Sequence, residues 1–166
     1  GPRRTRARRT ARARGGPQVR VFSPTGRLVS QFFAFPSTFR LGLSVGVGNV
    51  NRDPAAEIAV VPLTVGGSQV RIFTYRGRLV SQFFAYGEAT RGGFNLDLGE
   101  VDADDRDEIV TGTEAGLAPQ VRVFDRRGRL EGAFFAFSSR LRTGVHVAVG
   151  DVDGDGTEDI IAAPAV

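Results

Sequence analysis

The chain contains no cysteine, no methionine and no tryptophan, and its 22 basic side chains are all arginine because lysine is absent too. Without cysteine, disulfide bonds and thiolate metal sites are excluded, and cysteine usage says nothing about the redox compartment. No apolar stretch approaches the roughly 20 residues that a membrane-spanning helix needs. What remains is 166 residues, 41% apolar and 24% charged, which is the composition of a folded globular domain.

Positive charge is concentrated at one end of the sequence. The first 14 residues contain seven arginines and no acid: Arg3, Arg4, Arg6, Arg8, Arg9, Arg12 and Arg14. Subtracting these seven charges from the net charge of +4 leaves −3 for residues 15–166, so the rest of the chain is mildly acidic. We interpret residues 1–13 as an Arg-rich tail with three open roles: docking on a polyanion or protein, nucleic-acid binding by phosphate neutralisation, or an inert linker.

An internal repeat fills the remainder of the chain. Every matching segment is offset by 51 residues without insertion or deletion, which divides the chain into repeats 14–64, 65–115 and 116–166. The clearest matches are a Gln-Val-Arg strand (18–22, 69–73, 120–124) and an aromatic segment (32–35, 83–86, 134–137). A fixed period of this length is the signature of a repeat architecture.

The pattern within one repeat is that of β-strands. Residues 145–149 alternate valine with other residues, and residues 160–163 form a short apolar run after an acidic loop. Residues 121–124 and 130–137 flank a Gly-containing turn, as in a hairpin. No segment sustains a 3.6-residue period, so we predict an all-β fold with four short antiparallel strands in each repeat.

Four antiparallel strands in about 40–50 residues match a β-propeller blade, with a β-solenoid or open meander as the alternative. Both faces of a blade pack against neighbouring blades. This packing would accommodate adjacent apolar residues such as Phe32 and Phe33, which point to opposite faces.

The strand order predicts half blades at both ends. Residues 18–35 supply the last two strands of a blade, and residues 144–164 supply the first two. Three blades are fewer than the roughly 4–8 that close a ring, and open sheet edges invite aggregation. We therefore expect a homo-oligomer, most simply a two-fold dimer with six blades in which the half blades of two copies complete each other.

An oxygen-rich loop follows the first strand of each blade. The third loop, residues 151–159, has carboxylates at loop positions 1, 3, 5 and 9 and glycine at position 6. Position 7 would contribute a backbone carbonyl, and such a set of hard oxygen ligands suits Ca²⁺. The predicted ligands are Asp151, Asp153, Asp155, Thr157 and Asp159 in the third loop; Glu100, Asp102, Asp104, Arg106 and Glu108 in the second; and Asn49, Asn51, Asp53, Ala55 and Glu57 in the first.

The three loops should differ in affinity. Asp105 replaces glycine at position 6 of the second loop, and aspartate tolerates a left-handed backbone better than most residues. Pro54 occupies that position in the first loop and cannot adopt a positive φ. With only two carboxylates as well, the first loop should bind metal most weakly.

The Asp-x-Asp-x-Asp-Gly-x-x-Asp loop, followed by a strand such as Asp159-Ile160-Ile161, resembles the FG-GAP and VCBS repeats. These are calcium-loop propeller blades also found in integrin α-subunits, and the aromatic segments resemble a bacterial secreted branch of that class. The resemblance implies a propeller, calcium ligands at loop positions 1, 3, 5, 7 and 9, and a binding role outside the cell or at its surface.

No residue pattern indicates an enzyme. His146 is the only histidine, its repeat counterparts are Ser44 and Asn95, and no nucleophile is paired with it. We expect a calcium-binding structural or adhesive module for extracellular protein or polymer interaction and self-assembly. Two alternatives are a lectin-like glycan binder with one pocket per repeat and binding of nucleic acid or another polyanion through the Arg-rich tail.

Overall fold

The computed structural model describes residues 16–165, and these form twelve β-strands and no helix. The strands are β1 (Gln18–Phe22), β2 (Leu28–Phe33), β3 (Leu43–Gly48), β4 (Glu57–Pro62), β5 (Gln69–Phe73), β6 (Leu79–Phe84), β7 (Phe94–Gly99), β8 (Glu108–Thr113), β9 (Gln120–Phe124), β10 (Leu130–Phe135), β11 (His146–Gly150) and β12 (Asp159–Ala163). The all-β prediction is confirmed. No helix long and apolar enough to cross a bilayer occurs in this part of the chain. The Arg-rich tail, and with it the predicted polyanion-binding arginines, lies outside the described residues.

The strands form four antiparallel sheets. Two sheets have four strands, in the orders β3-β4-β5-β6 and β10-β9-β8-β7, and two have only two strands, β1-β2 and β11-β12. Within each sheet, consecutive strands pair antiparallel with each other. The sheets are therefore out of phase with the 51-residue repeats, because each complete sheet takes its first two strands from one repeat and its last two from the next.

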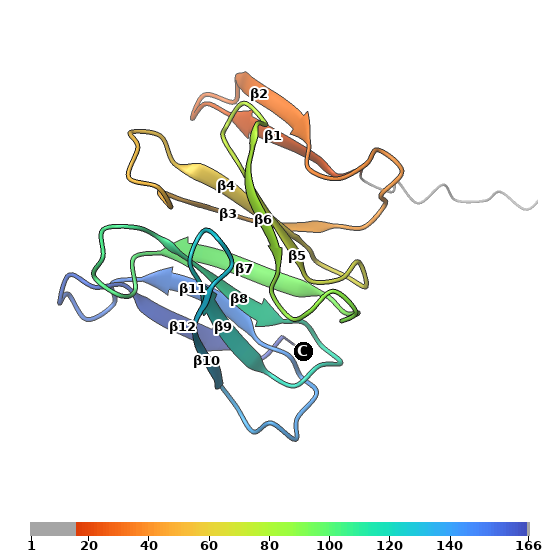
Figure 1. Cartoon of the computed structure of the whole chain (residues 1–166), viewed down its shortest axis with the longest axis vertical. Helices are drawn as coiled ribbons and strands as arrows, with labels where there is room; N and C mark the ends of the chain where they lie inside the picture. Colours follow the sequence, from red (N-terminus) through yellow and green to blue (C-terminus); the bar gives the residue numbers. More distant parts are fainter. Residues whose placement is uncertain (1–15, 166) are drawn as a thin grey trace, which may run out of the picture.

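The sheets stack face to face, with the hydrophobic core divided into three layers between them (Figure 1). The middle layer, between the two four-stranded sheets, includes the fully buried Phe94, Ile72 and Ile109. The innermost strands β3, β7 and β11 lie beside one another from sheet to sheet. Alternating apolar residues on both faces of each sheet make this stacking favourable, since each exposed sheet face would otherwise leave valine and phenylalanine in water.

Arginines of the Gln-Val-Arg strands link neighbouring sheets. Arg71 of β5 donates to the backbone carbonyl of Ala34 in the preceding sheet, and Arg122 of β9 donates to Ala85 in the same way. The Arg122 guanidinium also lies 4.6 Å from the centre of the Tyr86 ring. These arginines therefore connect each sheet to the one before it.

One packing expectation was wrong. The second phenylalanine of each aromatic pair does not pack between blades: Phe33, Phe84 and Phe135 are 57%, 41% and 48% exposed. Their neighbours Phe32 and Phe83 pack on aromatic rings of the next sheet instead. Phe33 lies on the face of the β1-β2 sheet that is turned away from the β3-β4-β5-β6 sheet, and no other described sheet covers that face.

The described sheets form an open stack, and no ring closes among residues 16–165 (Figure 1). The structure therefore establishes stacked antiparallel sheets but not a closed propeller.

Candidate metal-binding loops

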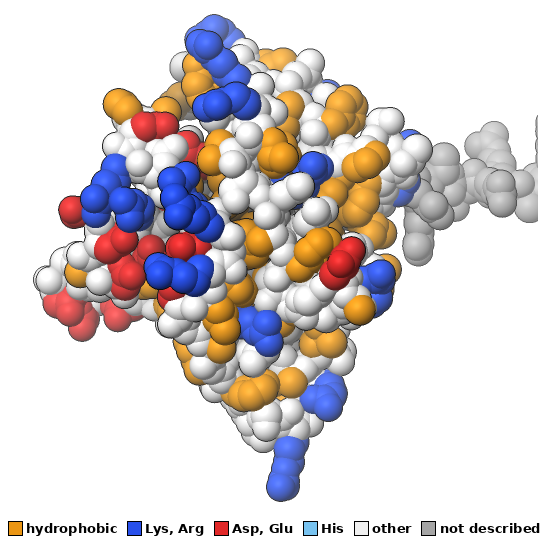
Figure 2. All heavy atoms as spheres, viewed as in Figure 1, with side chains coloured by type: hydrophobic (Ala, Val, Ile, Leu, Met, Phe, Trp, Pro, Cys, Tyr) orange, Lys and Arg blue, Asp and Glu red, His pale blue; other side chains and the backbone are white. Residues whose placement is uncertain are grey.

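The three oxygen-rich loops lie at one side of the stack. Each joins the first two strands of a sheet, β3 to β4, β7 to β8 and β11 to β12, so the repeat places all three at equivalent ends (Figure 1). Acidic and arginine side chains gather on this side of the molecule (Figure 2). The loops thereby create a strongly polar edge next to the hydrophobic stack.

The loop backbones turn through left-handed conformations. Position 4 has positive φ in all three loops, at Arg52 (65°), Ala103 (62°) and Gly154 (82°). Position 6 also has positive φ in the second and third loops, at Asp105 (62°) and Gly156 (93°). Pro54 cannot follow, because its ring fixes φ near −65°. The first loop therefore differs in backbone shape from the other two, as its sequence predicted.

Carboxylates from loop positions 1, 3 and 9 converge in two of the loops. Glu100, Asp102 and Glu108 each offer an oxygen within 4.8 Å of the others, and so do Asp151, Asp153 and Asp159. Two oxygens bound to one Ca²⁺ at about 2.3–2.6 Å lie at most roughly 5 Å apart. The spacing in both groups therefore fits a shared calcium ion, and the residues involved are among those that the sequence nominated.

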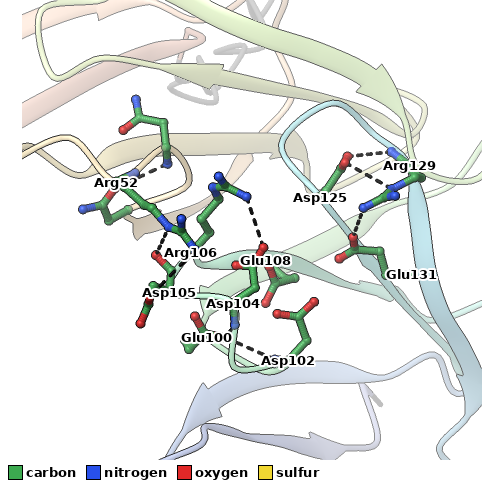
Figure 3. A network of polar contacts seen from close by, with 12 residues as sticks. Arg52, Glu100, Asp102, Asp104, Asp105, Arg106, Glu108, Asp125, Arg129 and Glu131 are labelled. Atoms are coloured by element: carbon green, nitrogen blue, oxygen red, sulfur yellow. Dashed lines mark hydrogen bonds and ion pairs between the residues drawn. The ribbon is translucent and has the colours of Figure 1, made fainter.

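The second loop contains buried oxygens without hydrogen-bond partners. These are Glu100 Oε2 and Asp104 Oδ1, and in the first loop Glu57 Oε2 has the same property. A buried carboxylate oxygen without a partner is costly unless a cation or donor satisfies it. Figure 3 shows Glu100, Asp102, Asp104 and Glu108 grouped around this loop. The residues present thus fit a bound divalent ion.

Burial and neighbouring charge act on the carboxyl group at loop position 9. The pKa of Glu108 is raised to about 7, chiefly by burial; a hydrogen bond from the Val101 amide lowers this pKa, and the carboxylates of Asp102 and Glu100 raise it. Burial and the Asp53 carboxylate likewise raise the pKa of Glu57. A cation would favour the charged form of either group, which is the coupling expected of a metal ligand.

Position 5 stands apart from the converging groups. Asp104 Oδ2 lies 3.2 Å from Arg106 Nη1, so its charge is partly met by the side chain at position 7 (Figure 3). Asp155 Oδ1 accepts a 2.8 Å hydrogen bond from the Thr157 amide. The carboxylates of Asp104 and Asp155 belong to neither of the two converging groups. Their coordination, and that of the position-7 carbonyls, stays a prediction.

In the first loop, side-chain amide groups contact the oxygens that a cation would otherwise bind. Asn51 Nδ2 donates to Asp53 Oδ2 and to Glu57 Oε1, each at 3.0 Å, and Asn49 Nδ2 donates to the Asp53 carbonyl at 2.7 Å. These N–H groups sit where a metal would otherwise draw the oxygens together. The first loop is thus internally satisfied to a greater degree, in keeping with the expectation of weakest binding.

Sequence reasoning overlooked the acid at position 8. The Asp107 carboxylate accepts a 2.6 Å hydrogen bond from the Asn49 amide of the preceding loop, and Glu158 accepts a 2.9 Å bond from the Glu100 amide. The return bonds run from the Asp107 and Glu158 amides to the carbonyls of Asn49 and Glu100, at 3.0 and 2.9 Å. Each pair ties one loop to the next. Position 8 of the first loop is Ala56, which has no carboxylate.

A polar hollow recurs beside the loops. A pocket of about 340 Å³ lies between the second loop and the β9–β10 turn, lined among others by Asp104, Glu108, Arg127 and Arg129. The repeat-equivalent residues Asp53, Glu57, Arg76 and Arg78 line a pocket of about 520 Å³ at the first loop. The two turns differ in sequence, Thr74-Tyr75-Arg76 against Asp125-Arg126-Arg127, so the same scaffold presents different side chains.

Comparison with known proteins leaves the family open. No family model and no curated protein matches the chain. One solved structure, a protein of unknown function from Bacteroides caccae, matches 90% of this chain with a TM-score of 0.45 and 14% identity. The match spans about half of that protein's length, 55%.

Proposed function

We propose that the chain is a calcium-braced β-propeller module that serves as a structural or adhesive binding unit outside the cell. The observation that carries the proposal is the convergence of three carboxylates at the same loop positions in two repeats. The partnerless buried oxygens of Glu100 and Asp104 support it, because they are acceptors that the protein alone leaves unmet.

Calcium has a mechanical role in this proposal. Glu100, Asp102 and Glu108 would hold one ion, and Asp151, Asp153 and Asp159 another. Bound calcium neutralises the repulsion among these carboxylates and fixes the end of strand β7 or β11 against the start of β8 or β12. Loops at the surface of the molecule suit surroundings rich in calcium, where modules that bind at about 10⁻⁴–10⁻³ M are occupied. We therefore place the protein outside the cell or at its surface.

Thermal unfolding with and without calcium tests the proposal. Calcium should raise the unfolding temperature relative to chelator, and magnesium at equal concentration should raise it less, since Mg²⁺ demands a stricter octahedron and keeps more of its waters. Titration calorimetry should give two stronger sites. A chain that unfolds at the same temperature in calcium and in chelator, with no binding heat, contradicts the proposal.

A pair of substitutions within one loop separates ligation from general charge. Asp102→Asn removes a converging carboxylate and should abolish one calcium site. Asp105→Asn removes the same charge three residues away, at a side chain that is 95% exposed and has positive φ, which asparagine tolerates. Asp105→Asn should leave the number of bound ions unchanged. Equal losses from both variants would mean that the loop only attracts cations by its net charge.

The recurring pocket supports a second candidate, glycan binding with one pocket per repeat. Tyr75 and Arg76 lie at one such pocket, with the Arg76 guanidinium 5.2 Å from the ring centre. An aromatic face beside hydrogen-bonding arginines and acids is suited to a sugar ring. Calcium-dependent binding on a glycan array, lost on Tyr75→Ala, would favour this candidate over a protein ligand.

A further inference from the structure

The two end sheets carry complementary free edges. Among residues 16–165, β12 pairs only with β11 and β1 pairs only with β2, whereas their repeat counterparts pair with each other inside the complete sheets. In the β8–β9 pair, Ile109, Val110 and Thr111 oppose Phe124, Val123 and Arg122. The equivalent positions are Ile160, Ile161 and Ala162 on β12, one repeat later, and Phe22, Val21 and Arg20 on β1, two repeats earlier. The two edges therefore have the residues of one strand pair.

An aromatic contact repeats across each internal junction and is missing at the ends. Phe73 of β5 packs on Phe32 of the preceding sheet, and Phe124 packs on Phe83, each with ring centres 5.0 Å apart. The next members of this series are Phe22 and Phe134. Phe22 is 53% exposed against 4% for Phe73 and 3% for Phe124, and Phe134 is 43% exposed. Each end presents one half of a contact that the molecule makes twice.

The glycines of the hairpin turns leave space for these rings. A Cβ on Gly77 would meet Phe32, and a Cβ on Gly128 would meet Phe83, at 2.5 Å in both cases. Gly26 is their counterpart, and a Cβ there would meet nothing within 4 Å. A site shaped for a phenylalanine ring therefore lies open beside Phe22.

The innermost strands repeat a second contact. The Leu96 amide donates to Ser44 Oγ of the preceding inner strand at 3.2 Å, and the Val147 amide donates to Asn95 Oδ1 at 2.9 Å. The following member of this series would join His146 on β11 of one copy to the Val45 amide on β3 of another. Val45 is 51% exposed, whereas its counterpart Leu96 is 5% exposed. The inner face of β3 is thus uncovered in the same register.

We propose that a second copy of this chain covers both ends: β12 of one copy pairs antiparallel with β1 of the other, and Phe134 of the first packs on Phe22 of the second. The proposal rests on the blade interpretation given above but not on calcium binding. Each chain holds two complete sheets and two halves, so two copies give six blades. Three copies would give nine, beyond the roughly 4–8 blades of known rings. Two identical junctions then close a two-fold dimer and pair the free edges of β1 and β12 in both copies.

The mass of the full chain in solution tests this proposal. Light scattering and native mass spectrometry at micromolar concentration should give twice the chain mass, in calcium and in chelator alike. A folded monomer in both buffers overturns the inference. Loss of calcium binding with an intact dimer would instead overturn only the proposed function.

Adjacent phenylalanines supply matched variants. Phe22→Asp and Phe134→Asp place a charge in the proposed junction and should weaken the dimer by roughly 30-fold or more. Phe135→Asp alters the exposed ring next to Phe134 on the opposite face of β10 and should leave the dimer intact. Circular dichroism checks that all three variants remain folded. Dissociation by Phe135→Asp but not by Phe22→Asp or Phe134→Asp overturns the inference.

Mixing the two dissociating variants tests the contact itself. In a pair made of one Phe22→Asp chain and one Phe134→Asp chain, one junction joins unaltered Phe134 to unaltered Phe22. The equimolar mixture should therefore form dimers that neither variant forms alone. A mixture that stays monomeric overturns the pairing of Phe22 with Phe134.

Discussion

The carboxylate of Asp107 accepts a 2.6 Å hydrogen bond from the backbone amide of Asn49, 58 residues earlier in the chain. The Asp107 amide returns a bond to the Asn49 carbonyl. One acidic residue thus satisfies both backbone groups of Asn49 and connects the first two oxygen-rich loops, independently of any metal.

We expect Asp107→Ala to lower the free energy of unfolding by about 1–3 kcal/mol, because a partly buried amide loses a charged acceptor. Urea titration in chelator measures the change. Asp107→Asn keeps an acceptor oxygen at the same position and should cost less. If the alanine variant unfolds at the urea concentration of the parent, the bond contributes nothing to stability.

Asn51→Asp should destabilise the chain in chelator and should make its unfolding temperature respond more strongly to calcium. In chelator, the variant loses two amide hydrogen bonds and brings a third carboxylate beside Asp53 and Glu57, so its unfolding temperature should fall. In calcium, the same carboxylate becomes a ligand, so the gain in unfolding temperature should exceed that of the parent. A fall of equal size in both buffers would show that the first loop has no metal site to restore.

The equivalent glycines at the ends of β7 and β11 should respond differently to alanine. A Cβ on Gly99 would run into Glu158 and Val149 of the next sheet, whereas a Cβ on Gly150 would meet nothing within 4 Å. Gly99→Ala should therefore cost about 1–3 kcal/mol in a urea titration. Gly150→Ala should change the free energy of unfolding of the chain by no more than about 0.5 kcal/mol.

The dimer gives a second measurement on Gly150→Ala. Under the two-copy arrangement this position faces β3 of the other copy, so the added methyl should weaken association while the chain stays stably folded. Unchanged association would place Gly150 outside the junction.

Tyr86 has a buried hydroxyl group that the other two repeats lack, and Tyr86→Phe measures its contribution to stability. The Tyr86 hydroxyl donates to the carbonyls of Thr111 and Gln120, at 3.1 and 2.9 Å, while Phe35 and Phe137 occupy the equivalent positions. Removing this hydroxyl group should lower the free energy of unfolding by about 0.5–1.5 kcal/mol near neutral pH.

The pH dependence of that difference has a defined sign. Burial raises the pKa of Tyr86 to about 12 from a reference value of 10.0. The neutral phenol is thus favoured in the folded state, so its contribution is complete below pH 10 and declines as pH rises toward 12. The parent should lose more stability than Tyr86→Phe between pH 9 and about 11.5. Parallel curves for the two proteins would mean that Tyr86 titrates as it does in water.

Much of the fold could be predicted because the same pattern of residues occurs in all three repeats. The valine alternation of residues 145–149 and the acidic loop after it locate two strands and the turn between them, and the 51-residue offset copies this result along the chain. The loop spacing also located the converging groups at Glu100 and Asp151.

The remaining features depend on distances between sheets, which spacing along the chain does not encode. Asp107 and Glu158 look like further loop acids until the preceding loop is placed beside them. Phe32 and Phe33 are equivalent in the sequence pattern, and only the placement of the sheets shows that Phe32 packs on Phe73 whereas Phe33 lies on the outer face of the end sheet. The amide contacts of Asn51 likewise depend on side-chain geometry within a loop that the sequence describes only as oxygen-rich.

Ala56 has a consequence for how a six-bladed ring would come apart. Within a chain, the carboxylates of Asp107 and Glu158 hydrogen-bond one oxygen-rich loop to the preceding one. At the junction between two copies, Ala56 would occupy the same position, so this side-chain hydrogen bond would be missing there. Mechanical force or dilution should then separate the ring first at its two junctions between copies and release single folded chains. An assembly divided in this way can exchange halves between rings without any chain unfolding.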